Sequence, residues 1–197
     1  MKTLGKSYKE SARTEAPIAR ILADRSSPRS FDPDHVIDAE SVSSMLEAAR
    51  WAPSGSNSQP RRFVVGVRGT ETFDLLASVL GAGNRLWAPR ASMLVLAVRV
   101  DTAPDGKPYK TADYDTGQAV ACLVIQAHHL GLVARQMAGF DAARAAELLG
   151  LSAHLVPRTI TAVGAAGSLD ALDAGTAEKE NEPRERIPLE TLVLRRD

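Results

Sequence analysis

Three short runs rich in β-branched and other apolar residues constrain the fold of this chain more than any other feature. They are residues 63–67 (FVVGV), 93–98 (MLVLAV) and 159–163 (TITAV), and turn-forming or charged residues bound each of them. Short runs without a polar face are typical of strands that lie inside a sheet. We therefore expect a central sheet that other elements cover.

Amphipathic helices are predicted around these strands. After Asp38, which is a preferred type of N-cap residue, four apolar residues within the segment 42–49 recur at helical spacing. Similar patterns predict helices over residues 17–24, 38–51, 71–80, 115–131 and 141–149. Asp115 is expected to cap the fourth helix and Gly131 to end it. Because helices dominate and alternate irregularly with strands, we expect an α+β fold in which helices cover one sheet.

The two ends of the chain differ from its middle. Residues 1–16 are polar and contain no apolar run like that of a secretion signal, so we expect a flexible arm before a single domain over residues 17–197. Residues 178–186 are too charged for a core position. The apolar residues 192–194 (LVL) that follow are a candidate edge strand, on this sheet or on that of a partner subunit.

Composition narrows the range of partners. The 24 basic and 24 acidic side chains cancel, so the overall charge attracts neither nucleic acid nor an anionic membrane. No apolar stretch approaches the roughly 20 residues that a membrane-spanning helix needs. The single cysteine, Cys122, excludes an intramolecular disulfide and fits a reducing compartment. We therefore expect a cytoplasmic protein that binds a small molecule rather than nucleic acid or a membrane.

The common motifs of nucleotide and zinc sites are missing from the sequence. It contains no Gly-x-Gly-x-x-Gly, no Gly-Lys-Ser, no paired cysteines and no His-Glu-x-x-His. Residues 81–84 (GAGN) come closest to a glycine-rich loop, but they lack a third glycine and do not directly follow a strand. His128 and His129 are neighbours on one helix and point about 100° apart, which does not suit two ligands of one metal ion.

Four arginines lie where loops or helix ends are expected: Arg25, Arg29, Arg184 and Arg186. Guanidinium groups bind phosphate oxygens through short, charge-assisted hydrogen bonds, and Ser26 and Ser27 add hydroxyl donors. For each arginine the alternative is an ordinary solvated side chain. A phosphate site would require the two ends of the chain to converge.

The segment 52–60 (APSGSNSQP) is a second candidate, because proline, serine and glycine directly follow an amphipathic helix there. Its two prolines stiffen the segment, and Gly55 permits the close approach of a flat molecule. Ser54, Asn57 and Gln59 offer donors and acceptors for the edge of a heterocycle. An ordinary polar connection between a helix and a strand remains the alternative.

These segments resemble the FMN-dependent nitroreductase family. Residues 25–31 (RSSPRSF) resemble its Arg-Arg-Ser-x-Arg-x-Phe opening, and residues 46–60 (LEAARWAPSGSNSQP) its Leu-x-x-Ala-x-x-Ala-Pro-Ser-x-x-Asn-x-Gln-Pro element, which is the most specific match. Further similar segments are residues 115–119 (DTGQA), 131–132 (GL), 137–141 (MAGFD) and 184–189 (RERIPL). The next residue, Arg61, stands where a tryptophan is common in the family. The resemblance implies a three-layer sandwich with a mostly antiparallel central sheet, and a homodimer whose C-terminal tails are candidates for exchange.

In that family the opening and the basic C-terminal element hold the FMN phosphate. The resemblance implies this role for Arg25, Ser27, Arg184 and Arg186. Ser26 stands where the family has a second arginine, so one cationic contact is lost or replaced by a hydroxyl. Arg29 is expected near the pyrimidine end of the flavin, where a cation stabilises negative charge on the reduced ring.

The resemblance also implies which residues surround the flavin ring. The family's Pro-Ser loop lies across the dimer interface, so contacts to the partner subunit's flavin are expected from Pro53, Ser54, Gly55 and Asn57. The backbone N–H of Gly139 is expected to face flavin N5, with Met137 and Ala138 beside it. Ala138 stands where many relatives have a glutamate, which removes a polar group beside N5. Asn84 lies where relatives place a residue against the pyrimidine edge.

The implied activity is the reduction of an electrophilic small molecule, such as a nitroaromatic, a quinone or an enone, by NADH or NADPH. Hydride passes through flavin N5 in ping-pong order. Because the cofactor carries the chemistry, no side-chain catalyst is expected. The alternative is a flavin-binding or regulatory module without turnover.

Overall fold

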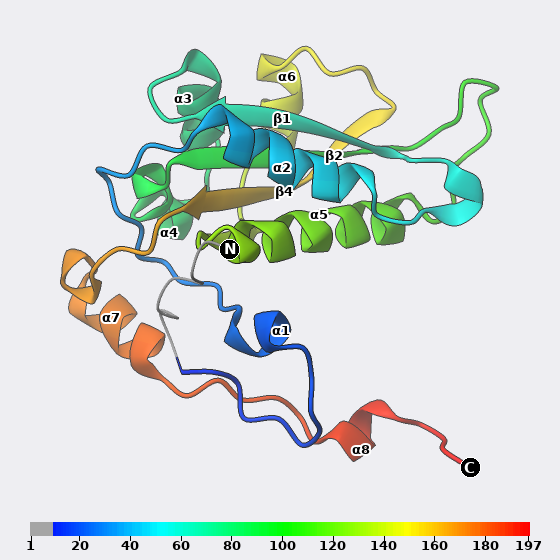
Figure 1. Ribbon diagram of the computed structural model, residues 1–197. Helices are drawn as coiled ribbons and strands as arrows, with labels where there is room; N and C mark the ends of the chain where they lie inside the picture. Colours follow the sequence, from blue (N-terminus) through cyan, green and yellow to red (C-terminus); the bar gives the residue numbers. More distant parts are fainter. Residues whose placement is uncertain (1–9) are drawn as a thin grey trace.

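The computed structural model describes residues 10–197 and contains a four-stranded antiparallel sheet. The strands are β1 (Arg61–Val67), β2 (Met93–Val100), β3 (Val133–Met137) and β4 (Leu155–Gly164), and they lie in the order β1-β2-β4-β3 (Figure 1). The three strands predicted from apolar runs are confirmed as β1, β2 and β4. Strand β3 contains two polar residues in five and forms one edge of the sheet.

Helices cover both faces of this sheet (Figure 1). Helices α2 (Ala39–Arg50) and α5 (Ala112–His129) pack on one face, and α3 (Glu71–Ser78) and α6 (Ala142–Leu148) pack on the other. Successive side chains of a strand point to opposite faces. Leu94 and Leu96 of β2 accordingly enter one core and Val95 the other, which explains why its sequence has no polar face. The predicted three-layer α+β sandwich is confirmed.

The helix starts predicted at Asp38 and Asp141 are confirmed, as is the helix end predicted at Gly131, but the predicted cap at Asp115 is wrong. Asp38 accepts a hydrogen bond from the backbone N–H of Ser41 at 2.7 Å, and Asp141 caps α6 in the same way. Gly131 follows α5 with a φ of +80°, the left-handed conformation that glycine adopts readily. The predicted cap residue Asp115, however, lies inside the first turn of α5, which begins at Ala112. Its buried carboxylate binds a different segment of the chain, as described below.

Several short elements complete the chain. They are α1 (Arg20–Asp24), η1 (Gly55–Asn57), α4 (Ala82–Arg85), η2 (Ala88–Arg90), η3 (Leu169–Ala171), α7 (Ala174–Asn181) and α8 (Leu189–Leu192). Helices α1, α7 and α8 lie beside the sandwich rather than in its layers (Figure 1). No helix within residues 10–197 has the length and apolar content needed to cross a bilayer.

The predicted edge strand at residues 192–194 is wrong for the sheet of this chain, because Leu192 ends α8 and Leu194 is fully exposed. Pairing with a partner subunit stays a prediction. Residues 1–9 of the predicted arm lie outside the described residues. The rest of that segment is hydrogen-bonded: Ala12 N–H donates to the carbonyl of Ala23, and the Glu15 carboxylate accepts from Leu189 N–H.

Candidate functional site

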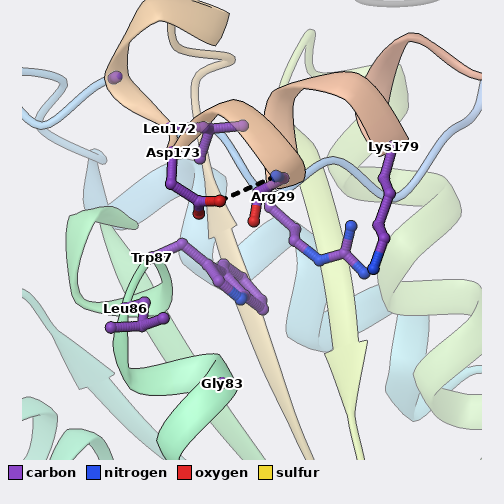
Figure 2. Close-up of a pocket in the computed structure, with 9 residues that line it drawn as sticks. Arg29, Gly83, Leu86, Trp87, Leu172, Asp173 and Lys179 are labelled. Carbon is purple, nitrogen blue, oxygen red and sulfur yellow. Dashed lines mark hydrogen bonds between the residues drawn. The ribbon is translucent and has the colours of Figure 1, made fainter.

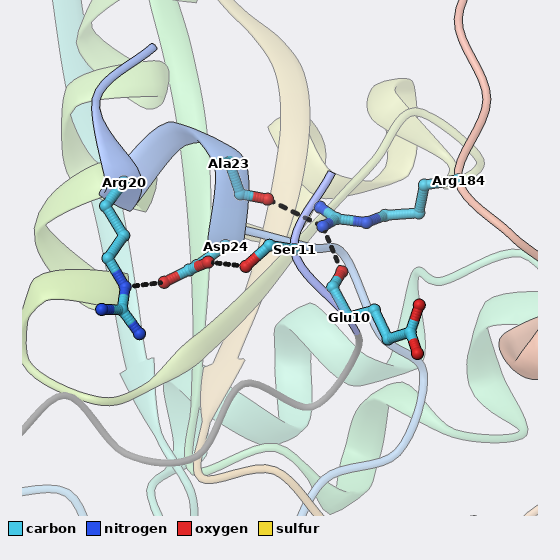
Figure 3. A network of polar contacts seen from close by, with 6 residues as sticks. All are labelled: Glu10, Ser11, Arg20, Ala23, Asp24 and Arg184. Atoms are coloured by element: carbon cyan, nitrogen blue, oxygen red, sulfur yellow. Dashed lines mark hydrogen bonds and ion pairs between the residues drawn. The ribbon is translucent and has the colours of Figure 1, made fainter. Parts of the chain in front are cut away.

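Three arginines from the two ends of the chain converge in the structure. Arg184 donates to the carbonyl oxygens of Arg25 at 2.6 Å and Ala23 at 2.7 Å, so the C-terminal segment lies against the end of α1 (Figure 3). Burial lowers the pKa of Arg25, and the positive charges of Arg184 and Arg186 lower it further. Such a cluster of cations is a candidate site for an anion with several oxygens.

A buried carboxylate fixes the end of α1 next to this cluster. Asp24 accepts hydrogen bonds from the Ser11 hydroxyl and from Arg20 Nε, the latter at 3.1 Å (Figure 3). The Ser11 hydrogen bond lowers the pKa of Asp24, whereas burial acts in the opposite direction. The charged Asp24 carboxylate therefore holds the end of α1 in place. Arg25 follows directly, so the position of its backbone is fixed as well. Its Nη1 lies 3.0 Å from the exposed hydroxyl of Ser27, while Ser26 is buried.

Arg29 does not join the cluster and pairs with helix α7 instead. Its Nη1 donates to Glu180 of α7 at 3.0 Å, and Arg135 of β3 lies 3.7 Å from the same carboxylate. The side chain of Glu180 is only 3% exposed, so the prediction that residues 178–186 are too charged for a core position is wrong at this residue. Two basic partners compensate its burial. Arg29 also lines a hollow of about 160 Å³ with Trp87 and other residues (Figure 2).

The end of β3 brings Gly139 and Asn84 together. The carbonyl of Gly139 accepts from the Gly81 N–H and from Asn84 Nδ2, both at 2.9 Å. Its own N–H has no acceptor within residues 10–197. Ala138 is exposed, whereas the Met137 side chain is buried in the core, so Met137 can present only its backbone to a ligand.

Gly81→Ala is expected to displace Gly139, because a Cβ at Gly81 would lie 2.9 Å from the Gly139 carbonyl oxygen. Overpacking of this kind lowers the free energy of unfolding by about 1–3 kcal/mol. Urea unfolding measures the loss, and the amide resonance of Gly139 reports the displacement. Gly83→Ala in α4, the short helix that Gly81 precedes, is the control, since a Cβ there meets nothing within 4 Å. Equal behaviour of the two variants would contradict this account.

A hollow of about 430 Å³ opens beside Ala138, between α5, the end of β3 and the first half of β4. It is lined by Asp113, Thr116, Gly117, Val120, Gln136, Ala138, Arg158 and Thr159. Arg158 Nε is 2.7 Å from the carboxylate of Asp113, which also binds Arg99. Asp113 therefore belongs to an ion-pair network.

Within residues 10–197, no three His, Cys, Asp or Glu side chains are grouped to hold a metal ion.

The loop 52–60 is held in a strained conformation. Ser56, Asn57 and Gln59 have φ values of 52°, 55° and 49°. This left-handed region costs a residue other than glycine roughly 1–2 kcal/mol. Such strain persists only where surrounding contacts impose it, and it occurs often at ligand sites. Pro53, Gly55 and Asn57 are exposed on this loop, and Ser54 is partly buried.

The loop and the arginine cluster lie at opposite ends of α5. The N–H of Gly55 donates to Asp115 in the first turn of α5. At the other end of that helix, burial lowers the pKa of His128, and the nearby charge of Arg25 lowers it further. Along α5, about 20 Å separates Asp115 from His128. The loop and the cluster of one chain therefore do not form a single site. Sequence patterns indicated both features but not their separation.

The sequence patterns did not predict the roles of three residues at these sites. Asp115 was interpreted as a helix cap and Glu180 as solvated charge. Arg61, which donates to the carbonyl of Ala52 in the loop, was interpreted as a departure from a family pattern. A charged residue beside a turn or in a polar run looks exposed when only its neighbours are considered. The one available signal was Arg61, a charge two residues before the run 63–67 that was predicted to be a buried strand.

Comparisons with known proteins agree with this fold. The model of the nitroreductase family matches residues 22–83 and 74–165. An uncharacterized 15.4 kDa protein of Mycolicibacterium smegmatis is 39% identical over 141 residues, which are 68% of this chain and 94% of that protein. A Streptomyces coelicolor protein, named provisionally as an NADH dehydrogenase/NAD(P)H nitroreductase, is 30% identical over 145 residues, 64% of this chain and 71% of its own. A crystal structure described as an oxidoreductase containing FMN superposes with a TM-score of 0.88 at 34% identity and covers 93% of both chains. The chain belongs to the nitroreductase family.

Proposed function

We propose that this protein is an FMN-dependent oxidoreductase that takes hydride from NADH or NADPH and passes it to an electrophilic small molecule. The observation that carries the proposal is the convergence of Arg25, Arg184 and Arg186 from the two chain ends. Membership of the nitroreductase family and the similarity to an oxidoreductase containing FMN support it.

The arginine cluster fits the phosphate of FMN. A phosphate monoester carries up to two negative charges, which Arg25 and Arg186 would neutralise. The Ser27 hydroxyl lies 3.0 Å from Arg25 Nη1 and would donate to the same group. Arg184 already bonds backbone carbonyl oxygens, so it would add charge and fix the two chain segments relative to each other.

The end of β3 fits the flavin ring. The N–H of Gly139 is available as a donor to N5, and Asn84 orients this peptide through its carbonyl. Arg29 would place a cation near the pyrimidine end, where negative charge collects on reduction. The nicotinamide and the electrophile would bind one after the other in the hollow beside Ala138, which corresponds to a ping-pong order.

FMN would supply the hydride chemistry itself, and the residues of this chain would bind, orient and exclude water. No side chain is required as a nucleophile or general base. Nitroaromatics, quinones and enones are the substrate classes we propose. The name of the Streptomyces coelicolor relative supports NADH or NADPH as the donor.

A homodimer would complete the site. The loop 52–60 and the arginine cluster of the same chain lie at opposite ends of α5, so the loop would contact the flavin of a partner subunit through Pro53, Ser54, Gly55 and Asn57. Trp51, at the end of α2 before this loop, is 74% exposed. A large exposed aromatic side chain is a typical interface anchor.

The purified protein is expected to be yellow and to be bleached by NADH or NADPH without oxygen. Absorption spectra taken under anaerobic titration with each nucleotide measure both properties, and a panel of oxidants then identifies the substrate class. A yellow protein that neither nucleotide reduces would support a binding module instead. A colourless protein that cannot be reconstituted with FMN would refute both functions.

A further inference from the structure

Two buried residues of opposite charge, Arg61 and Asp115, contact the loop 52–60 from the side of the core. We propose that this buried pair positions the loop, holding its strained conformation before any flavin is bound. The consequence for flavin affinity rests on the function proposed above. The conformational part does not depend on that function and can be measured in the flavin-free protein.

Arg61 holds the start of the loop. It follows Pro60 directly and is the first residue of β1, yet its guanidinium group points back to the end of α2. Nη2 donates to the carbonyl oxygens of Arg50 at 2.8 Å and Ala52 at 2.7 Å. Carbonyl groups at a helix end lack intrahelical partners and carry partial negative charge, so a cation there is favourable.

Asp115 holds the middle of the loop. Its Oδ2 accepts from the N–H of Gly55 at 3.2 Å and from the hydroxyl of Thr111 at 2.8 Å. A Cβ at Gly55 would lie 3.0 Å from the Thr111 oxygen, so the fit is tight enough to favour glycine. Asp115 is only 2% exposed, and its negative charge opposes the lowering of the pKa of Arg61 by burial. The two charges therefore compensate each other.

The end of the loop is also fixed. The carbonyl of Pro60 accepts from Val100 N–H at 2.9 Å and from the Thr116 hydroxyl at 3.3 Å. Between these fixed points lie the left-handed residues Ser56, Asn57 and Gln59, none of which is buried. The loop closes on itself through the N–H groups of Asn57 and Gln59, which donate to the carbonyl and the hydroxyl oxygen of Ser54, both at 3.0 Å. The fixed points hold this turn in place against the core and so help to maintain its strain.

Arg61 is poorly suited to a purely stabilising role. Its Nη1 is buried and has no hydrogen-bond partner within residues 10–197. A buried donor without a partner destabilises a fold, and an apolar side chain of similar size often stabilises it equally well or better. An arginine at this place is better explained by the two carbonyl oxygens that it fixes than by its contribution to the core.

Arg61→Met tests the proposal, with Arg68→Met as a matched control. Arg68, at the other end of β1, also donates to carbonyl oxygens, those of His35, Arg90 and Ala91, but it does not contact the loop. Hydrogen exchange of the flavin-free protein is expected to be at least tenfold faster within residues 54–59 in Arg61→Met and unchanged there in Arg68→Met. Unchanged exchange in Arg61→Met would overturn the proposal.

Arg61→Lys serves as a second variant in case the methionine variant does not fold. It keeps the charge but loses the planar fork that reaches two carbonyl oxygens. We expect a smaller increase in exchange over the same residues, about threefold. The absence of any increase in a folded Arg61→Lys would count against the proposal, because an ammonium group would then replace the guanidinium fully.

The dissociation constant for FMN is the second measurement. It is expected to rise at least tenfold in Arg61→Met and to stay unchanged in Arg68→Met, even where their melting temperatures fall equally. A more mobile loop with unchanged FMN affinity would overturn the link between the buried pair and the flavin. A wild-type protein that binds no FMN would refute the proposed function, and hydrogen exchange alone would then decide the positioning role.

Discussion

Arg25→Ala combined with Arg186→Ala is expected to raise the dissociation constant for FMN by about 100-fold or more. Each charge-assisted hydrogen bond contributes roughly 1.5–3 kcal/mol, and the double variant removes two of the three cations of the cluster. Arg184 is left in place because it fastens the backbone of residues 23–25. Titration of the flavin-free protein, followed by flavin fluorescence, measures the change.

Arg144→Ala combined with Arg195→Ala is the matched control for this prediction. It removes the same charge from two exposed arginines that pair with Glu147 and Asp197. FMN affinity is expected to stay within about twofold of the wild type, because exposed ion pairs contribute little. Similar affinities of the two double variants would contradict a phosphate site at the arginine cluster. Riboflavin, which lacks the phosphate, should bind both equally.

Glu180→Ala is expected to lower the free energy of unfolding by about 3 kcal/mol or more. Removing one partner of a buried ion pair costs roughly 3–5 kcal/mol, because the remaining charge stays buried without compensation. Here the remaining charges are Arg29 and Arg135, whose side chains are 29% and 24% exposed. Partial exposure places the expected loss at the lower end of that range. Urea unfolding measures it.

Glu178→Ala is the control for this prediction, because Glu178 lies on the same helix and is exposed. Its effect is expected to stay within about 0.5 kcal/mol. Glu180→Gln keeps hydrogen-bonding atoms but removes the charge, so its loss should fall between those of the two alanine variants. Equal stability of the Glu180→Ala and Glu178→Ala proteins would show that the ion pair contributes nothing to folding.

The layers of the fold follow from local sequence patterns. Residues 93–98 predicted a buried strand because neighbouring positions of a strand face opposite sides and each is apolar. Asp38 and Asp141 predicted helix starts because a cap interacts with a backbone N–H only three residues away. Such interactions are complete within a few residues, so the sequence determines them directly.

The tertiary structure decided which charged groups meet. Asp115 is of a residue type that often caps helices, but the N–H group that it binds belongs to Gly55, 60 residues earlier in the chain. Glu180 stands in a charged run and is buried because Arg29, 151 residues away, faces it. A charge can be buried only where another part of the fold compensates it, and no local pattern records that partner. Strands β1, β2 and β4, the helices packed around them and the caps at Asp38 and Asp141 therefore follow from the sequence alone, whereas the buried pairs and the arginine cluster depended on long-range packing.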